Sequence, residues 1–547
     1  MKLKNLSSAA MALLLLLLFL PVFYHVIMYG NNMNYNPDHK IYALYGNKVL
    51  LALVLIGVLA FLAVLYFVRK IPSNKYTVKG FVAVALLSCV AFYFVNVEVS
   101  KCIAFYGGWD CGMVADSARW FYEGGELGQG DYYYIFTNNV PIVWVLNKLY
   151  AFACEMKSYP YNPEFIWIQF QCLMHALTVF FSAMAVLVAT GKVSLSAVTL
   201  IVNMVLLGLS PWKIIPYTDG TPIVFPVLVF FLYAVFLRMK SGWKYLVWLV
   251  VTYLGAIGGI LKATCYVVLI AIVIVDFIWI LINKEKTILK VRELAVRCGL
   301  LACGLALAMG CRNGMYRSLD YEYKESFDIG WLGFLYDGLN EESTGACSAD
   351  AYEMVRNYAG ESREYRDALM LQRVRERIDE KGFNGLMDFW LRKQVMTYND
   401  GTFSWYQEGF FNAWAYENIT DSSWKEPLRK FYWEDGANYP QFVTWSHGIW
   451  LFVLVGVIVE AVMVFVLSIV CMRKPLAERE KCSDLQISTV AMLTFIGVFL
   501  FLMLFEGRAR YLYTNIPIFS IMAIMGYWKF VEFVEYCRTN WFNRQYS

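Results

Sequence analysis

The sequence is poor in charge. Only 16% of its 547 residues are Asp, Glu, Lys or Arg, whereas a typical soluble domain carries about 25%. Hydrophobic residues make up 59% of the chain, and the mean hydropathy is +0.48. A soluble protein could not bury this much apolar surface, so we predict an integral membrane protein in contact with a lipid bilayer. The net charge of +4 is small, and without a dense basic cluster nothing favours nucleic-acid binding.

The sequence also lacks the short motifs of nucleotide and zinc sites. It contains no phosphate-binding GxxxxGKS or GxxxxGKT segment and no GxGxxG fingerprint, so nothing indicates cytoplasmic nucleotide chemistry. The thirteen cysteines include no CxxC pair, and most lie in apolar runs, where a thiol acts as a small hydrophobe. No zinc site is therefore predicted. The sequence leaves open whether Cys102, Cys111 and Cys347, which we place outside the membrane, form disulfides.

Long apolar windows dominate what remains. The N-terminal run is too long for a signal peptide and is followed by no small-x-small cleavage site, so we expect it to be the first transmembrane helix. Windows of spanning length predict an all-α polytopic protein of about twelve transmembrane helices, near 8–29, 49–68, 80–99, 164–189, 195–211, 217–237, 244–260, 264–282, 294–312, 446–470, 486–505 and 516–536.

The basic loops predict the orientation of these helices. Cytoplasmic loops are enriched in Lys and Arg, and the segments rich in these residues are 69–79, 238–244, 283–292, 472–481 and 537–547. All of them fall on one side only if the ambiguous apolar stretch 139–156 does not cross. We therefore expect 139–156 to lie along the outer surface as an interfacial helix, with both termini in the cytoplasm and 100–163 and 313–445 outside it.

This topology divides the chain into five parts. Residues 313–445 carry 23 Asp and Glu against 14 Lys and Arg, are rich in Trp and Tyr, and show a helical pattern over about 351–396. They predict a large, mainly helical extracytoplasmic loop domain rather than a linker. The five parts are the N-terminal helices (1–99), the first extracytoplasmic loop (100–163), a transmembrane core (164–312), the loop domain (313–445) and the C-terminal helices (446–547).

Asp110 and Asp116 lie in the segment GGWDCGMVADSARW, where a helix should leave the bilayer. Ionisable groups at a membrane boundary are costly unless they have a task. Residues six apart do not share a helix face, so the two acids do not form a simple metal-binding pair. One of them could act alone as a general base, because a carboxylate near a dry surface can have its pKa raised toward the operating pH. The alternative is that both are solvated loop acids.

Three further polar features fall on the same predicted side. Asp219 lies in the turn PWKIIPYTDGTP, where it either serves the site or caps a helix. Lys262 lies between two spans, and its ammonium either binds a phosphate or extends to the interface. Arg508 and Arg510 either bind a lipid phosphate or anchor the adjoining helices at the membrane interface. Idle loops would divide between both faces, so this agreement predicts one site on the extracytoplasmic face.

These residues resemble the GT-C superfamily of polytopic glycosyltransferases, which take a sugar from a polyprenyl-phosphate carrier. The pattern D-x7-A-R-x4-G, formed by Asp110, Ala118, Arg119 and Gly124, is similar to the first outer loop of the mannosyltransferase and aminoarabinose-transferase branch. That branch follows its Asp with an Asn-Pro-rich stretch and a surface helix, which TNNVPIVWVL at 137–146 resembles.

Other positions extend the resemblance over nearly the whole chain. Asp219 matches the second Asp of the branch, and Arg508, Arg510 and Tyr511 resemble its late R-x-R-Y element. The LKAT stretch at 261–264 is similar to a K-P-T of Gram-positive members. Two further stretches resemble those members, 338–350 and 399–405.

The chain departs from that branch in two respects. Two extra apolar spans precede the Asp-bearing loop, and Cys111 stands where an acid often follows the Asp. No tight two-carboxylate metal site is therefore expected, and a need for Mg²⁺ or Mn²⁺ stays open.

The resemblance implies a bacterial membrane enzyme that transfers a sugar, with inversion, from a polyprenyl-phosphate donor to an extracytoplasmic cell-envelope glycan, teichoic-acid-like polymer or lipid. Asp110 would be the general base, with Asp219 and Asp116 as second choices that orient the acceptor or share a metal. Lys262, Arg508 and Arg510 would stabilise the phosphate leaving group. The full set of expected substrate-binding residues is Arg119, Lys262, Glu506, Arg508, Arg510 and Tyr511.

Two other classes of protein remain open. A lipid-linked glycan transporter or flippase would show charges at mid-span or broken helices in matching halves, and the charges here cluster at the predicted outer boundary. An O-antigen-ligase-like polymer transferase also uses a large outer loop and arginines, but needs no Asp in its first loop. The sequence names neither the sugar nor the acceptor nor the length of the prenyl chain.

Overall fold

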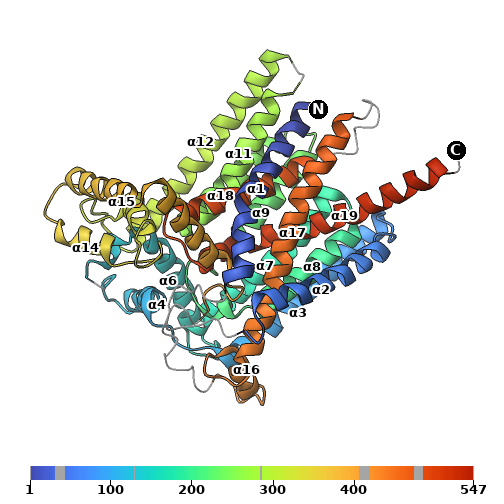
Figure 1. The fold of residues 1–547 in the computed structure, drawn as a ribbon. Helices are drawn as coiled ribbons and strands as arrows, with labels where there is room; N and C mark the ends of the chain where they lie inside the picture. The colour runs from blue at the N-terminus through green and yellow to red at the C-terminus, as the bar shows by residue number, and fades with distance from the viewer. Residues whose placement is uncertain are drawn as a thin grey trace.

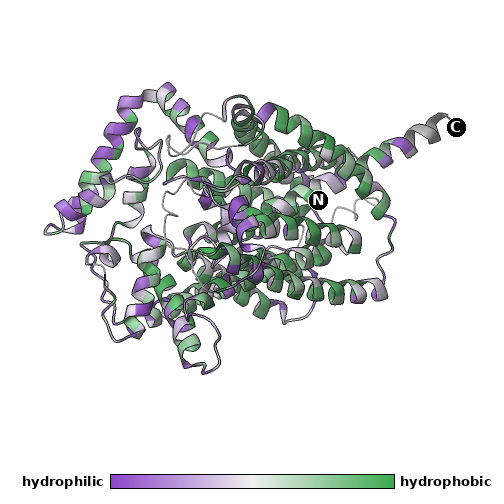
Figure 2. Ribbon diagram, turned by 90° about the horizontal axis from the view of Figure 1, so that it is seen from below, coloured by the Kyte–Doolittle hydropathy of each residue, from purple (hydrophilic) through white to green (hydrophobic). Residues whose placement is uncertain are grey.

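The computed structural model describes residues 2–30, 43–128, 130–283, 286–405, 419–473 and 484–545. Over these ranges the regular structure is helical, with nineteen α-helices joined by turns and short 3₁₀ segments (Figure 1). Long apolar helices form a bundle, and more polar helices gather at one end of it. Figure 2 shows the hydrophobic residues concentrated on the bundle and the hydrophilic residues on the helices at that end.

Ten helices of the described chain are long and apolar enough to cross a membrane. They are α1 (Lys2–Tyr29), α2 (Asn47–Val68), α3 (Lys75–Ile103), α7 (Phe165–Thr190), α10 (Lys244–Leu261), α11 (Tyr266–Leu281), α12 (Thr287–Ser318), α17 (Tyr439–Arg473), α18 (Leu485–Leu504) and α19 (Ile516–Gln545). The protein is thus a polytopic membrane protein, as the composition predicted.

Two shorter apolar helices complete the bundle, α8 (Val193–Leu209) and α9 (Val224–Arg238). Every window expected to span therefore contains a helix, but the window 217–237 is corrected at its start. Its first seven residues belong to the turn that follows the 3₁₀ segment η3 (Pro211–Ile214), and α9 begins only at Val224. This turn carries Asp219, so the correction bears on the site.

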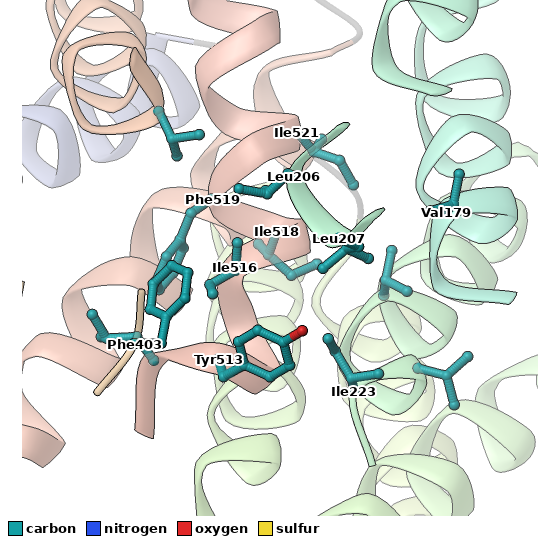
Figure 3. Packing of buried hydrophobic residues seen from close by; sticks show 14 of the residues in the cluster. Val179, Leu206, Leu207, Ile223, Phe403, Tyr513, Ile516, Ile518, Phe519 and Ile521 are labelled. Atoms are coloured by element: carbon teal, nitrogen blue, oxygen red, sulfur yellow. The ribbon is translucent and has the colours of Figure 1, made fainter. Parts of the chain in front are cut away.

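The core of the bundle runs between α1, α17 and α19 on one side and α7, α8 and α9 on the other. Large side chains are fully buried there, with Trp212, Trp405 and Trp450 among them. Figure 3 shows this packing at the start of α19, where Ile516 and Tyr513 lie near Leu207 of α8. Because these contacts hold the turns at the helix ends, the bundle positions the site described below.

Residues 319–438, here called the head region, join α12 to α17. Their helices are α13 (Gly330–Gly338), α14 (Asp350–Asn357), α15 (Arg363–Tyr398) and α16 (Lys425–Tyr432). The expected helical pattern over about 351–396 corresponds to α14 and α15, with a break at Gly382, whose φ is 58°. A small apolar cluster that includes Leu332, Val355 and Met370 joins α13, α14 and α15, together with Ile135 of the first loop.

The first loop is also helical. It contains α4 (Trp109–Tyr122), α5 (Tyr132–Ile135) and α6 (Val140–Glu155). Helix α6 packs on α4, α7 and α12, and at 16 residues it is not one of the candidate spans. The expectation that 139–156 does not cross the membrane stays a prediction. The start of α1 and the end of α19 lie at the end of the bundle away from the head region (Figure 1).

Small residues let α10 and α12 approach closely. A Cβ atom on Gly304 of α12 would lie 2.2 Å from Thr252 Oγ1 and 2.9 Å from the backbone nitrogen of Tyr253. Close backbone approach at small residues is typical of membrane helix pairs. We expect Gly304→Leu to force α12 away from α10 and to cost about 1–3 kcal/mol, measured as a lower apparent Tm in detergent.

The matched control for this change is on the same helix. Gly310 has open space where its Cβ would be, so Gly310→Leu should leave the apparent Tm nearly unchanged. Equal melting of the two variants would contradict the close packing of α12 on α10.

Candidate functional site

A cavity of about 620 Å³ opens where α4, α10, α13 and α18 meet the turns between the bundle helices. Its size is typical of small-molecule sites, which hold a few converging polar groups in an apolar wall. The polar side chains on its wall are Asp110, Asn138, Asn139, Tyr217, Thr218, Lys262, Thr264, Glu506, Arg508, Arg510 and Tyr511. The apolar part of the wall includes Ile260, Leu261, Trp331, Phe334, Phe501 and Phe505. Six residues expected from the sequence therefore meet in one cavity.

Asp110 lies in the first turn of α4, where the helix dipole favours a negative charge. Its Oδ2 accepts a hydrogen bond from the hydroxyl of Tyr217 at 3.3 Å, and Tyr217 also lies 3.2 Å from Oδ1 of Asn139. Asn139 in turn donates to the hydroxyl of Tyr132 at 2.7 Å. Burial, followed by the charge of Asp110, raises the pKa of both tyrosines well above the usual range. The partners that orient Asp110 are therefore neutral hydroxyl groups.

Lys262 ends α10 and brings its ammonium to the cavity. Its Nζ lies 2.8 Å from Oδ1 of Asp219 and 4.3 Å from the centre of the Tyr511 ring. Asp219 is fully buried, and its other oxygen lies 3.9 Å from Nε of Arg510. Asp219 thus contacts two cations of the site from behind, while Asp110 lines the cavity itself. This geometry favours a positioning role for Asp219 over the catalytic role considered from the sequence.

The loop of residues 505–511, between α18 and α19, supplies the remaining charges. The Tyr511 hydroxyl donates to Oε1 of Glu506 at 2.7 Å, and Nε of Arg508 lies 3.3 Å from the same oxygen. The guanidinium of Arg510 stacks 4.5 Å from the centre of the Trp109 ring, which fixes its direction relative to α4. Both arginines are about 5% exposed. Phosphate oxygens suit such cations, because guanidinium groups bind them in a bidentate manner.

Buried polar contacts beneath the cavity hold these turns together. The Tyr513 hydroxyl lies 2.8 Å from Oγ of Ser210 and 2.8 Å from Nε2 of His175 on α7. The Thr264 hydroxyl lies 2.9 Å from that of Thr514, and Asn515 donates to the carbonyl of Thr264 at 3.1 Å. Three turns that are distant in sequence are therefore tied into one wall.

Asp116 and Arg119 lie away from the cavity. Nη2 of Arg119 lies 2.9 Å from Asp116 and Nη1 lies 2.8 Å from Glu164, while the Tyr106 hydroxyl donates to Asp116. Glu164 is the residue before α7, so this cluster joins α4 to the bundle. Of the residues expected from the sequence, these two are the ones that the structure does not bring to the site.

Several side chains on the cavity wall were missed by sequence reasoning. Tyr217 lies two residues before Asp219, and Asn139 lies in the Asn-rich stretch that marked the surface helix. Trp331 and Phe334 come from α13 in the head region. The first two stood beside recognised motifs, but nothing local relates α13 to a loop some 175 residues further along the chain.

Two other expectations concern metals and thiols. Within the described ranges, no group of three or more His, Cys, Asp and Glu side chains is arranged to hold a metal ion. Asp110 and Glu506 in the cavity are held by tyrosine and arginine instead, so these residues do not offer a Mg²⁺ or Mn²⁺ site, and no step below uses one. Cys102, Cys111 and Cys347 are free thiols.

The stretch 399–405 serves the packing of the chain rather than the cavity wall. Asp400 accepts hydrogen bonds from the backbone nitrogens of Thr402 and Ser404, at 2.8 and 2.7 Å. Nδ1 of His447 accepts from the nitrogen of Gly401 at 3.3 Å, so its Nε2 carries the proton that bonds to Asn47 Oδ1 at 3.0 Å. This buried network joins α2, α15 and α17.

The fold and the cavity define a polytopic helical membrane protein with a charged cavity at one end of its bundle. The chain belongs to the family described as "conserved hypothetical integral membrane protein", whose model matches residues 3–530. Comparison with curated proteins gives no match. Comparison with solved structures also gives none. The family establishes the membrane class and assigns no activity, so the function is argued from the cavity.

Proposed function

We propose that the protein is a bacterial GT-C-like glycosyltransferase that moves a sugar from a polyprenyl-phosphate carrier to a hydroxyl of a cell-envelope acceptor. One observation carries this proposal. A carboxylate held by neutral hydroxyls, Asp110, shares a 620 Å³ cavity with three cations, Lys262, Arg508 and Arg510. A base and an anion-binding group in one cavity are what displacement of a phosphate by a hydroxyl requires.

In this mechanism the acceptor hydroxyl attacks the anomeric carbon of the donor. The bond from that carbon to the acceptor oxygen forms as the bond to the phosphate oxygen breaks, and the configuration inverts. Asp110 takes the hydroxyl proton, and the lipid phosphate leaves with the bonding electron pair. General-base help of this kind is typically worth about 10²–10⁴-fold.

The cations of the cavity suit the leaving group. Charge accumulates on the phosphate as it departs, and fixed positive groups in a partly dry site stabilise that charge without reorganisation. Arg510 is held by stacking on Trp109, and Lys262 by its pair with Asp219. Glu506 and Tyr511 set the direction of Arg508 through their mutual contacts. Each cation is thus oriented before a substrate arrives.

The apolar part of the wall suits the carrier lipid. Ile260 and Leu261 at the end of α10, and Phe501 and Phe505 at the end of α18, lie beside the charged groups. A phosphate at the arginines would leave its hydrocarbon chain near these side chains and near the bilayer. This supports a lipid-linked donor over a soluble sugar phosphate, and undecaprenyl phosphate is the carrier we expect in bacteria.

The basic loops support an orientation in which the cavity faces the extracytoplasmic side and both termini are cytoplasmic. The segment 69–79, which is rich in Lys and Arg, connects α2 to α3 at the end of the bundle opposite the cavity. The acid-rich head region would then cover the acceptor outside the cell.

The test is reconstitution of the purified protein in liposomes. Undecaprenyl-phosphate hexoses and pentoses, labelled in the sugar, are offered with a delipidated envelope fraction as acceptor. We expect label in the envelope fraction and an equal amount of free undecaprenyl phosphate from one of the donors. A transporter would instead move the labelled lipid across the bilayer without transfer, and a polymer ligase would act only on diphosphate-linked glycans. Either result would overturn the proposal.

A further inference from the structure

Lys393 is a buried lysine that the proposed chemistry does not use. It lies in the last part of α15, after the break at Gly382, and its side chain is fully buried. Its ammonium donates to three backbone carbonyls, those of Gly338 at 2.7 Å, Phe505 at 2.5 Å and Met503 at 3.3 Å. These carbonyls belong to the end of α13 and the end of α18.

Glycines around Lys393 leave space for its side chain, because a larger residue at their positions would collide with it. A Cβ on Gly345 would lie 2.7 Å from both Cδ and Cε of Lys393, and a Cβ on Gly507 would lie 2.9 Å from its Cε. Gly345 also has a φ of +73°, which favours glycine. A Cβ on Gly338 would lie 2.5 Å from the carbonyl oxygen of Leu504. Three glycines from two segments, 338–345 and the loop of residues 505–511, therefore bring their backbones close to one lysine.

Two backbone hydrogen bonds join the same segments. The nitrogen of Glu506 donates to the carbonyl of Phe334 at 3.0 Å, and that of Gly507 donates to the carbonyl of Gly345 at 2.9 Å. Phe334 and Glu506 both line the cavity. The loop of residues 505–511 is thus attached to the head region at the position where its charged side chains begin, and Lys393 lies behind that attachment.

Burial of this ammonium costs free energy. Burial lowers the pKa of Lys393 to about 7, and the neighbouring Glu506 opposes the shift. On the α13 side, burial raises the pKa of Asp337 to about 7, and Glu506 adds to that shift. An apolar side chain of similar length would avoid the cost of burying a cation. The three carbonyls that accept from Lys393 lie at helix ends, where a cation is favoured, and this explains why a lysine occupies the position despite the cost.

We propose that Lys393 is a positioning residue for the loop of residues 505–511, and that it couples docking of the head region to the phosphate-binding geometry of Arg508 and Arg510. The inference rests on the proposed function for the identity of the ligand, and on the contacts alone for the positioning. Without the ammonium, three carbonyls lose their shared donor, while the two backbone bonds from the loop to the head region remain.

The test compares Lys393→Met with Lys381→Met in the full-length protein. Lys381 lies on the same helix but pairs with Glu341 of the head region, so the control makes the same substitution elsewhere on α15. We expect amide hydrogen exchange in 505–511 to rise about tenfold in Lys393→Met, because the loop opens locally more often. The control variant should match the wild type there, and amides of α7 should be unchanged in both.

A binding measurement gives the second readout. With undecaprenyl phosphate as the probe, we expect the Kd to rise about tenfold in Lys393→Met and to stay constant in Lys381→Met. If the protein transfers sugar, kcat should fall as well, because Arg508 and Arg510 of this loop stabilise the leaving group in the proposed mechanism, and Arg510 stacks on Trp109 at the start of α4. Exchange is measured without substrate, so it tests the positioning even if no transfer is found.

Lys393→Gln guards against a general loss of folding, since its amide can still donate to two of the carbonyls. An intermediate rise in exchange confined to 505–511 supports the proposal. Unchanged exchange in that loop in Lys393→Met would overturn it. A rise in exchange throughout the bundle in both Lys393→Met and Lys393→Gln would overturn it as well, because Lys393 would then stabilise the whole fold rather than this loop.

Discussion

Replacing Asp110 by Asn should lower the rate of sugar transfer by about 10²–10⁴-fold. The amide has the size of the carboxylate and can still accept the hydrogen bond from Tyr217, which lies 3.3 Å from Asp110. It cannot take the proton of the acceptor hydroxyl, so the loss should appear in kcat while the affinity for the donor changes little. The measurement is initial-rate kinetics in liposomes at saturating donor.

Two acids of the same loop serve as controls for this change. Asp131 is exposed, and Asp131→Asn should transfer sugar at the wild-type rate. Asp116 is paired with Arg119 away from the cavity, so Asp116→Asn should retain most of the activity and lower stability instead. If Asp110→Asn transfers sugar as fast as the wild type, or if Asp116→Asn abolishes transfer in a folded protein, then the assignment of the base is wrong.

The second large effect is expected at Arg510. Arg510→Met should lower kcat about 10²–10³-fold, the loss seen when one preorganised group that stabilises developing charge is removed. Met keeps an apolar stem against Trp109, whose ring lies 4.5 Å from the guanidinium, and the buried Asp219 retains Lys262 at 2.8 Å. The fold should therefore survive the change. Arg510→Lys should recover only part of the rate, because an ammonium lacks the bidentate geometry.

The matched control for Arg510 is an arginine with the same charge and no role in the cavity. The Arg373 side chain in the head region is 57% exposed and pairs with Glu376 on its own helix, so Arg373→Met should leave kcat unchanged. The decisive quantity is the division between kcat and KM. A higher KM with an unchanged kcat would mean that Arg510 binds ground state and transition state equally, and that would contradict its assignment to the leaving group.

Much of the fold was predictable because its signal is local. Each apolar window longer than about 17 residues formed a helix, since an isolated helix satisfies its own backbone in a membrane. The window 217–237 is helical only in part. Pro211 and Gly220 interrupt the apolar sequence around Asp219, and α9 begins only at Val224. Averaging hydropathy over a window hides such breaks.

The site was predictable only in part. Lys262, Arg508 and Arg510 were predicted because cations beside spans suit a lipid phosphate and because all three fall on one predicted side of the membrane. Charge and position alone did not distinguish Asp110 from Asp116, which lie six residues apart on α4, and only the resemblance preferred Asp110. The structure places Asp110 on the cavity wall and Asp116 beside Arg119. The difference depends on which face of α4 meets the turn at Tyr217, and this contact joins residues more than 100 positions apart.

The sequence by itself determined the class of this protein and the placement of its charges near helix ends, because hydropathy and charge act along short stretches of chain. Only the tertiary structure decided which charges share a cavity, since that depends on packing between distant turns. It put Asp219 behind Lys262 and Arg510, and it brought Lys393 of the head region against the loop that carries the arginines. Neither contact has a signature in local sequence, because each joins buried groups whose partners lie on other helices.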